Sequence, residues 1–157
     1  MDKSDLLNQW HTALRTFHIQ HILAAKHNEK MHKRLGVPVV ILGAVVGTSV
    51  FANLESNPET WVKILIGSLS VTSAVLAALQ TFMGFSDLAE KHKNASTKYG
   101  MLRRELEQFM ATQSPEDQNH ATFLEEFRKQ WDQVDAESPN TQEAFYERAY
   151  AQVHNSD

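Results

Sequence analysis

Eight histidines are the residues of this chain most able to bind a metal ion or to exchange a proton near neutral pH. His18 and His21 are three residues apart, and His11 shares a helical face with His18, so such pairs could chelate a metal. No third ligand has a convincing spacing, and the chain has no cysteine, which excludes thiolate sites and disulfides. The sequence also lacks a glycine-rich phosphate loop. We therefore predict no metal, no cofactor and no enzymatic activity.

A stripe of small and polar residues marks the second of two long apolar segments. Its members recur every three or four positions: Ser70, Ser73, Ala77 and Gln80, continuing through Gly84 to Asp87. Polar groups inside a bilayer must face protein or water. The stripe could line an aqueous pore, or it could form hydrogen bonds between packed helices, which is the interpretation we favour for an isolated hairpin. Two helices cannot enclose a channel, so the pore interpretation requires several copies.

The first apolar segment contains the pattern Gly43-x-x-x-Gly47. Two glycines at this spacing let two helix backbones approach closely inside a membrane. The approaching helix could be the second apolar segment of the same chain, or it could belong to another subunit. The sequence favours neither alternative.

Two apolar segments must position these residues. Residues 35–54 carry no charge, and in residues 64–85 the only strongly polar side chain is Gln80. A bilayer core of about 30 Å needs about 20 apolar residues in a helix, so both segments are predicted to span a membrane. The alternative is a soluble bundle with two core helices. The joint, residues 55–63, is short enough to make the spans antiparallel neighbours.

Local signals in the joint support a second helix that begins near its end. Asn57 could cap this helix, with Pro58 at its first position and Glu59 in its first turn. Phe51 and Trp61 fall where an aromatic belt would meet the membrane interface.

Charge predicts the orientation. Cations flank the two spans on the side of the termini, and the joint holds only Lys63; the flanking cations are Lys26, Lys30, Lys33, Arg34, Lys91, Lys93 and Lys98. Cytoplasmic flanks carry the Lys/Arg excess, so both termini are expected in the cytoplasm of a multi-pass inner-membrane protein. We expect no cleaved secretory signal, because residues 1–34 lack a short apolar region before a cleavage site. Residues 1–115 carry a net charge of +3, which suits anionic lipids, and residues 116–157 carry −7. No basic stripe indicates direct binding of nucleic acid.

Each span continues into a polar helix with a seam of mostly apolar residues. Residues 5–34 carry one seam, from Leu7 through His21 and Asn28, and residues 86–113 carry the other, from Leu88 through His92 and Tyr99 to Phe109. Both seams leave the same hairpin, so we predict an antiparallel coiled coil. Gly36 and Pro38 could bend the first helix where it meets the membrane.

The register of the coil follows from helix rise if Leu35 and Phe85 lie at the same depth. Paired residue numbers should then sum to about 119–120. This register sets His21 opposite Tyr99 and Asn28 opposite His92, so that polar layers coincide, and it sets Phe17 opposite Leu102. We interpret the polar layers as structural residues that determine register, with metal binding and pH sensing as alternatives.

Residues 115–157 are predicted to form two short acidic helices. Ser114-Pro115 is a helix-start signal, and Ser138-Pro139-Asn140 separates the two helices. Their aromatic residues must be buried, and the coil of the same or a neighbouring subunit is the expected place. The predicted fold is therefore an all-α membrane protein: a two-transmembrane hairpin, an antiparallel cytoplasmic coiled coil and two short C-terminal helices.

An ordered set of short motifs resembles a known family. They are His32 to Leu35 (HKRL), Pro38 to Gly43 (PVVILG), Gly47-Thr48, Leu79 to Phe82 (LQTF), Ala89-Glu90-x-His92, Tyr99 to Glu107 (YGMLRRELE) and Ala136 to Asn140 (AESPN) ahead of Tyr146. Together they resemble the SLATT family, the SMODS and SLOG-associating two-transmembrane effector domains. The resemblance covers nearly the whole chain, as a single effector domain over residues 1–157.

The resemblance implies a bacterial inner-membrane effector of an anti-phage or conflict system. Such an effector would assemble into a homo-oligomer and permeabilise the membrane when a separately encoded sensor detects infection. The sensor would be a nucleotide second-messenger synthase or a reverse-transcriptase module. The alternative function is a passive membrane anchor or scaffold that recruits a cytosolic partner and conducts nothing.

Overall fold

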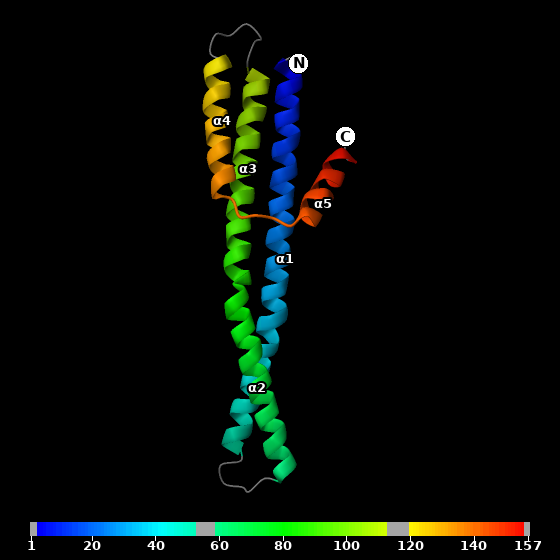
Figure 1. Cartoon of the computed structure of the whole chain (residues 1–157), viewed down its shortest axis with the longest axis vertical. Helices are drawn as coiled ribbons and strands as arrows, with labels where there is room; N and C mark the ends of the chain where they lie inside the picture. The colour runs from blue at the N-terminus through cyan, green and yellow to red at the C-terminus, as the bar shows by residue number, and fades with distance from the viewer. Residues whose placement is uncertain (1–2, 53–58, 113–119, 156–157) are drawn as a thin grey trace. The chain divides into compact units, whose positions relative to one another are not determined.

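The computed structural model describes residues 3–52, 59–112 and 120–155, which contain five helices and no strand. The helices are α1 (Lys3–Ala52), α2 (Thr60–Met83), α3 (Phe85–Thr112), α4 (His120–Glu137) and α5 (Glu143–His154) (Figure 1). They form two compact units, which we call the core unit (residues 1–27 and 88–157) and the hairpin unit (residues 28–87). The all-α prediction with two short C-terminal helices is confirmed.

The hairpin unit consists of the C-terminal half of α1 and all of α2. Pro38 lies inside α1 without ending it, although its missing N–H removes one helical hydrogen bond. α2 begins at Thr60 with Glu59 as its N-cap, so Glu59 precedes the first turn that we predicted it to occupy. The predicted cap Asn57 and Pro58 lie outside the described residues, as do the other residues of 55–58 in the 55–63 joint.

Gly84 separates α2 from α3. It has a left-handed conformation, with φ of 55° and ψ of 31°, and it is the C-cap of α2. The sequence predicts a second span that runs to Phe85 and continues into the following helix, whereas α2 ends at Met83. A glycine after an apolar helix is the usual C-terminal signal, because other residues pay about 1–2 kcal/mol in this conformation.

The core unit packs the N-terminal part of α1, α3 and α4 around one cluster of aromatic and aliphatic side chains. Buried Phe127 of α4 stacks on Trp10 of α1 at 5.8 Å, and Phe123 stacks on Phe109 of α3 at 3.7 Å. Leu14 and Leu106 are fully buried in the same cluster. The expectation that the C-terminal aromatics are buried against the coil is confirmed for α4, within the same chain. The start signal Ser114-Pro115 lies outside the described residues, and α4 begins at His120.

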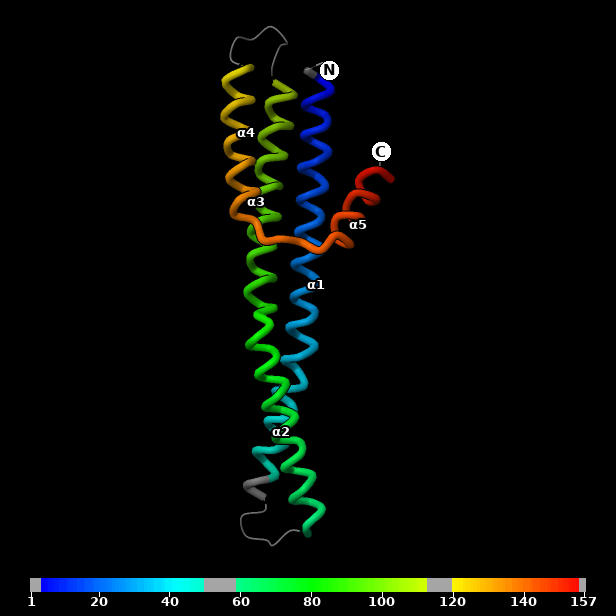
Figure 2. The backbone as a smooth tube through the Cα atoms, in the orientation of Figure 1, coloured from blue at the N-terminus to red at the C-terminus, as the bar shows by residue number. Residues whose placement is uncertain are grey.

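The chain crosses from α4 to α5 along residues 138–142 (Figure 2). This segment is tied to α1, because the Gln20 amide donates a hydrogen bond to the Thr141 hydroxyl. α5 then buries Phe145, Ala149 and Val153.

The antiparallel coil is confirmed, and its contacts include some at the predicted register and some that depart from it. His21 stacks on Tyr99 at 5.3 Å, as predicted. Phe17 also contacts Tyr99, at 5.5 Å, where Leu102 was expected, and His92 bonds to His21, where Asn28 was expected. Tyr99 is about one helical turn nearer the N-terminus of α3 than Leu102, the expected partner of Phe17. His92 is about two turns nearer that end than Tyr99, the expected partner of His21.

The cause is the assumption that Leu35 and Phe85 lie at the same depth. Within the hairpin unit, Gly36 is opposite Gln80. Gln80 lies about one helical turn before the residue that the predicted register sets opposite Gly36. The alignment of the two helices is therefore already offset in the hairpin.

Candidate membrane-spanning site

The polar stripe of α2 faces α1 of the same hairpin. Ser70, Ser73, Ala77 and Gln80 are all half-buried, in a helix that has no fully buried residue. The Ser73 hydroxyl is 3.5 Å from the carbonyl oxygen of Val39, and the Ser70 hydroxyl donates to the Ile66 carbonyl of its own helix at 3.0 Å. These hydroxyls are therefore satisfied inside the hairpin.

Gln80 is seated on a glycine of the facing helix. A Cβ at Gly36 would lie 3.0 Å from Nε2 and 3.3 Å from Oε1 of Gln80, so a side chain there would require the amide to shift by a few tenths of an ångström. The Gln80 Nε2 is also 3.4 Å from the Nδ1 of His32. The sequence analysis assigned Gly36 only a part in bending α1. The sequence did not predict that Gly36 packs against Gln80. A usable signal was that this glycine lies near the predicted depth of Gln80, the only strongly polar side chain of the second span.

The glycines of the Gly43-x-x-x-Gly47 pattern lie apart from the described side chains of α2. A Cβ at either position would meet nothing within 4 Å. α2 of the same chain therefore does not fill this face of α1.

The outer surface of the hairpin is apolar. The exposed large side chains include Val37, Val40, Ile41, Ile64, Leu65, Val71, Val75 and Phe82. Thr48, Ser68, Thr72 and Thr81 point outward, and each hydroxyl donates to a carbonyl of its own helix at 2.9–3.0 Å. No polar group of these side chains needs water, which is what a lipid-facing surface requires.

Length and composition agree with two membrane crossings. Two stretches are long and apolar enough to span a membrane, and the most apolar window of each is entirely unburied in the chain. Near one end, Trp61 is exposed and its indole donates to the Glu59 carboxylate at 2.6 Å, as suits an interfacial residue. The side chain of Phe51, its predicted counterpart, lies outside the described residues.

The family model of the SMODS and SLOG-associating 2TM effector domain family 4 matches residues 10–157. The chain belongs to this family. No curated protein and no solved structure matches the chain.

Membership assigns the parts of this 2TM effector domain. The C-terminal half of α1 and α2 are its two transmembrane helices, and the chain is a membrane protein. The family suggests an effector of conflict systems, and its name implies association with SMODS and SLOG partners in a sensor–effector arrangement. It is a family of effector domains and is not known as a catalytic fold.

The predicted polar layers of this SLATT domain are all buried: His21, Asn28, His92 and Tyr99. The Nδ1 atoms of His21 and His92 are 3.0 Å apart. The Tyr99 hydroxyl donates to Asp135 of α4 at 2.6 Å. Burial and this bond raise the pKa of Tyr99 above its usual value. Within the described residues, no group of three or more His, Asp or Glu side chains could hold a metal ion.

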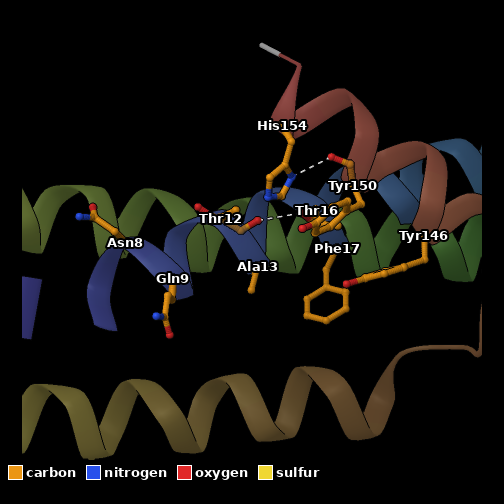
Figure 3. Close-up of a pocket in the computed structure, with 9 residues that line it drawn as sticks. All are labelled: Asn8, Gln9, Thr12, Ala13, Thr16, Phe17, Tyr146, Tyr150 and His154. Atoms are coloured by element: carbon orange, nitrogen blue, oxygen red, sulfur yellow. Dashed lines mark hydrogen bonds between the residues drawn. The ribbon is translucent and has the colours of Figure 1, made fainter. Parts of the chain in front are cut away.

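The core unit also has an aromatic groove that the sequence analysis did not identify. The groove lies between α1 and α5, has a volume of about 440 Å³, and is lined by Phe17, Tyr146, Tyr150 and His154 together with polar residues of α1 (Figure 3). Tyr146 extends toward Phe17, and Tyr150 stacks on His154 at 3.8 Å. The signal was the spacing of Tyr146, Tyr150 and His154, which are four residues apart on one helical face.

Proposed function

We propose that this domain is a homo-oligomeric effector of bacterial anti-phage defence that permeabilises the inner membrane when a separately encoded sensor acts on its core unit. The observation that carries the proposal is the open face at Gly43 and Gly47, which leaves room for a helix of another copy. A single hairpin cannot enclose a channel, so permeabilisation requires such an assembly. The family supports the effector role.

The sensor would be a nucleotide second-messenger synthase or a reverse-transcriptase module. The core unit is the part that we expect it to act on, because the core lies at the cytoplasmic side in the proposed topology. Nucleic acid is not an expected ligand, and lipid surrounds the hairpin.

The position of the polar stripe suggests how the assembly opens. Ser73 and Gln80 contact α1 in the structure, so they face protein. A path lined by Ser70, Ser73, Ala77 and Gln80 therefore requires α2 to separate from α1. The structure corresponds in this proposal to the closed state.

A disulfide between α1 and α2 should therefore hold the effector closed. The chain has no native cysteine, so Val39→Cys with Ser73→Cys provides one defined pair at a close contact. We expect the oxidised double variant to lose depolarisation of cells, measured with a membrane-potential dye, and to regain it after reduction. Oligomer size should not change.

The matched control is Val40→Cys with Thr72→Cys, two exposed positions on the outer surface. Each single-cysteine variant and this outward pair should depolarise cells as the parent does. A fully crosslinked Val39–Ser73 pair that still depolarises would exclude separation of the two helices as the opening step.

The second candidate function is a passive membrane anchor or scaffold. The observation in its favour is that every stripe hydroxyl and the Gln80 amide already have partners within the hairpin. An anchor predicts an unchanged membrane potential in cells that express the parent protein with its sensor, together with co-purification of the sensor.

Both termini are expected in the cytoplasm, because the Lys/Arg residues concentrate on the terminal side of the spans. A cysteine at Ser56 should react with an impermeant thiol reagent in whole cells, and one at Ser114 should react only after lysis. The reverse labelling pattern would overturn this topology.

A further inference from the structure

A hydrogen-bonded pair of histidines is buried between α1 and α3 of the core unit. The Nδ1 atoms of His21 and His92 are 3.0 Å apart, and both side chains are buried. A bond between two Nδ1 atoms needs one ring to donate a proton and the other to accept it, so at least one ring is neutral. Two protons on the facing nitrogens would remove the bond.

The pair is connected to α4 through one tyrosine. His21 stacks on the Tyr99 ring at 5.3 Å with an interplanar angle of 17°. The Tyr99 hydroxyl donates to Asp135 Oδ1 at 2.6 Å, and the same oxygen accepts a bond from the Trp131 indole at 3.1 Å. A change at the histidines therefore acts on the residue that links α3 to α4.

Among the described residues, no carboxylate contributes to the pKa shift of either ring. The nearby titratable groups are His18 on α1, which bonds to the Ser96 carbonyl at 2.7 Å, Tyr99 on α3, and Asp135 on α4, which contacts the hydroxyl of Tyr99. In the described part of the chain, no carboxylate bonds to either ring and no charged group of α5 contacts them. A proton added here would place an uncompensated charge in the core.

We propose that the His21–His92 pair is a proton-sensitive latch, which holds α1, α3 and α4 together when neutral and loosens them when it is protonated. Burial and, as the smaller cause, the charge of His92 together lower the pKa of His21 from 6.5 to about 4. Burial also lowers the pKa of His92. Unfolded histidines bind protons near pH 6.5, so the unfolded chain binds more protons than the folded core below that pH.

The sign of the pH dependence follows from this difference. The latch is fully stabilising above about pH 6.5, and its contribution is lost as the pH falls toward the folded pKa of about 4. For His21 alone, the folding equilibrium constant should fall about tenfold between pH 7.5 and pH 5.5.

The latch also deepens the proposed function, on which this step rests. A leak of protons from a more acidic exterior would lower the cytosolic pH and loosen the core, which would open further copies. Permeabilisation would then reinforce itself after the first opening.

Urea unfolding of the full chain in nanodiscs tests the latch without any conduction. With Trp61→Phe as background, fluorescence reports only Trp10 and Trp131, which both lie in the core. We expect the unfolding midpoint to fall between pH 7.5 and pH 5.5. The double variant combines His21→Phe, which keeps a ring to stack on Tyr99, with His92→Leu. In this variant, the change of the folding equilibrium constant between pH 7.5 and pH 5.5 should be at least tenfold smaller.

The matched control is His154→Gln. His154 is exposed and bonds only to its own helix at the Tyr150 carbonyl, so the pH dependence should be unchanged. A double variant that retains the full pH dependence would overturn the latch. If the double variant does not fold, His92→Gln, which keeps a hydrogen bond to His21, replaces it in the urea experiment.

Histidine NMR titration of the folded parent gives a second, independent measurement. We expect the His21 signal to titrate near pH 4 and the His92 signal below pH 6.5, and ordinary titration of both near pH 6.5 would overturn the proposal. Dye release from liposomes at internal pH 7.5 and 5.5 separates the two claims. If the unfolding midpoint depends on pH as expected but no dye is released at either pH, the latch is supported and permeabilisation is not.

Discussion

Gln80→Leu is expected to abolish depolarisation while leaving membrane insertion and oligomer size unchanged. The amide contacts Gly36 and His32 in the closed hairpin, and hydrogen bonds of this kind inside membranes are worth only about 0.6 kcal/mol on average. Leucine has a similar volume, so the hairpin should still form. In an open path, however, a ring of leucines forms an apolar constriction that excludes water and blocks ions.

Crosslinking measures the oligomer and a membrane-potential dye measures conduction, so the two effects are separable. The matched control is Thr81→Leu, at the adjacent residue. Thr81 is exposed on the outer surface, and its hydroxyl bonds to the Ala77 carbonyl of its own helix at 3.0 Å. This variant should depolarise cells as the parent does. Equal depolarisation by the Gln80→Leu protein would remove Gln80 from the path.

Phe127→Ala is expected to destabilise the core unit by about 3–5 kcal/mol. The Phe127 side chain is 1% exposed, stacks on Trp10 at 5.8 Å and contacts Phe123 at 5.5 Å. Truncation leaves a cavity between α1 and α4 that these rigid rings cannot fill. Since domains are stable by only about 5–15 kcal/mol, the loss should be visible as a large fall in the urea midpoint of core fluorescence.

Phe82→Ala is the matched control on the same residue type. Phe82 is 85% exposed on the hairpin, so its truncation creates no cavity. The core midpoint should remain within about 0.5 kcal/mol of the parent, as for surface substitutions in general. A small effect of Phe127→Ala would mean that α4 does not pack on α1 as the structure has it.

The proposals give the two units different tasks. The hairpin unit holds the groups that would line a path, and they are satisfied against α1 in the closed state. The core unit holds the groups that would control opening, in which His21 contacts both His92 and Tyr99, and Tyr99 bonds to Asp135 of α4. α1 is one continuous helix from Lys3 to Ala52 and therefore belongs to both units.

The sequence by itself determined the all-α fold, the two membrane spans, the antiparallel coil and the family. These follow from patterns that are local in the chain. Uncharged stretches of about 20 residues meet the bilayer thickness, and three-four spacing defines each seam. The predicted contact of His21 with Tyr99 was also correct, because both residues lie on these seams.

Only the tertiary structure decided how the two seams align and which faces remain open. Helix rise alone did not predict that Gln80 would lie against Gly36 or that His92 would bond to His21. The open face of α1 at Gly43 depends likewise on the path of the neighbouring helix. Periodicity identifies the face of a helix that is buried, whereas contacts between side chains determine the depth at which two such faces meet.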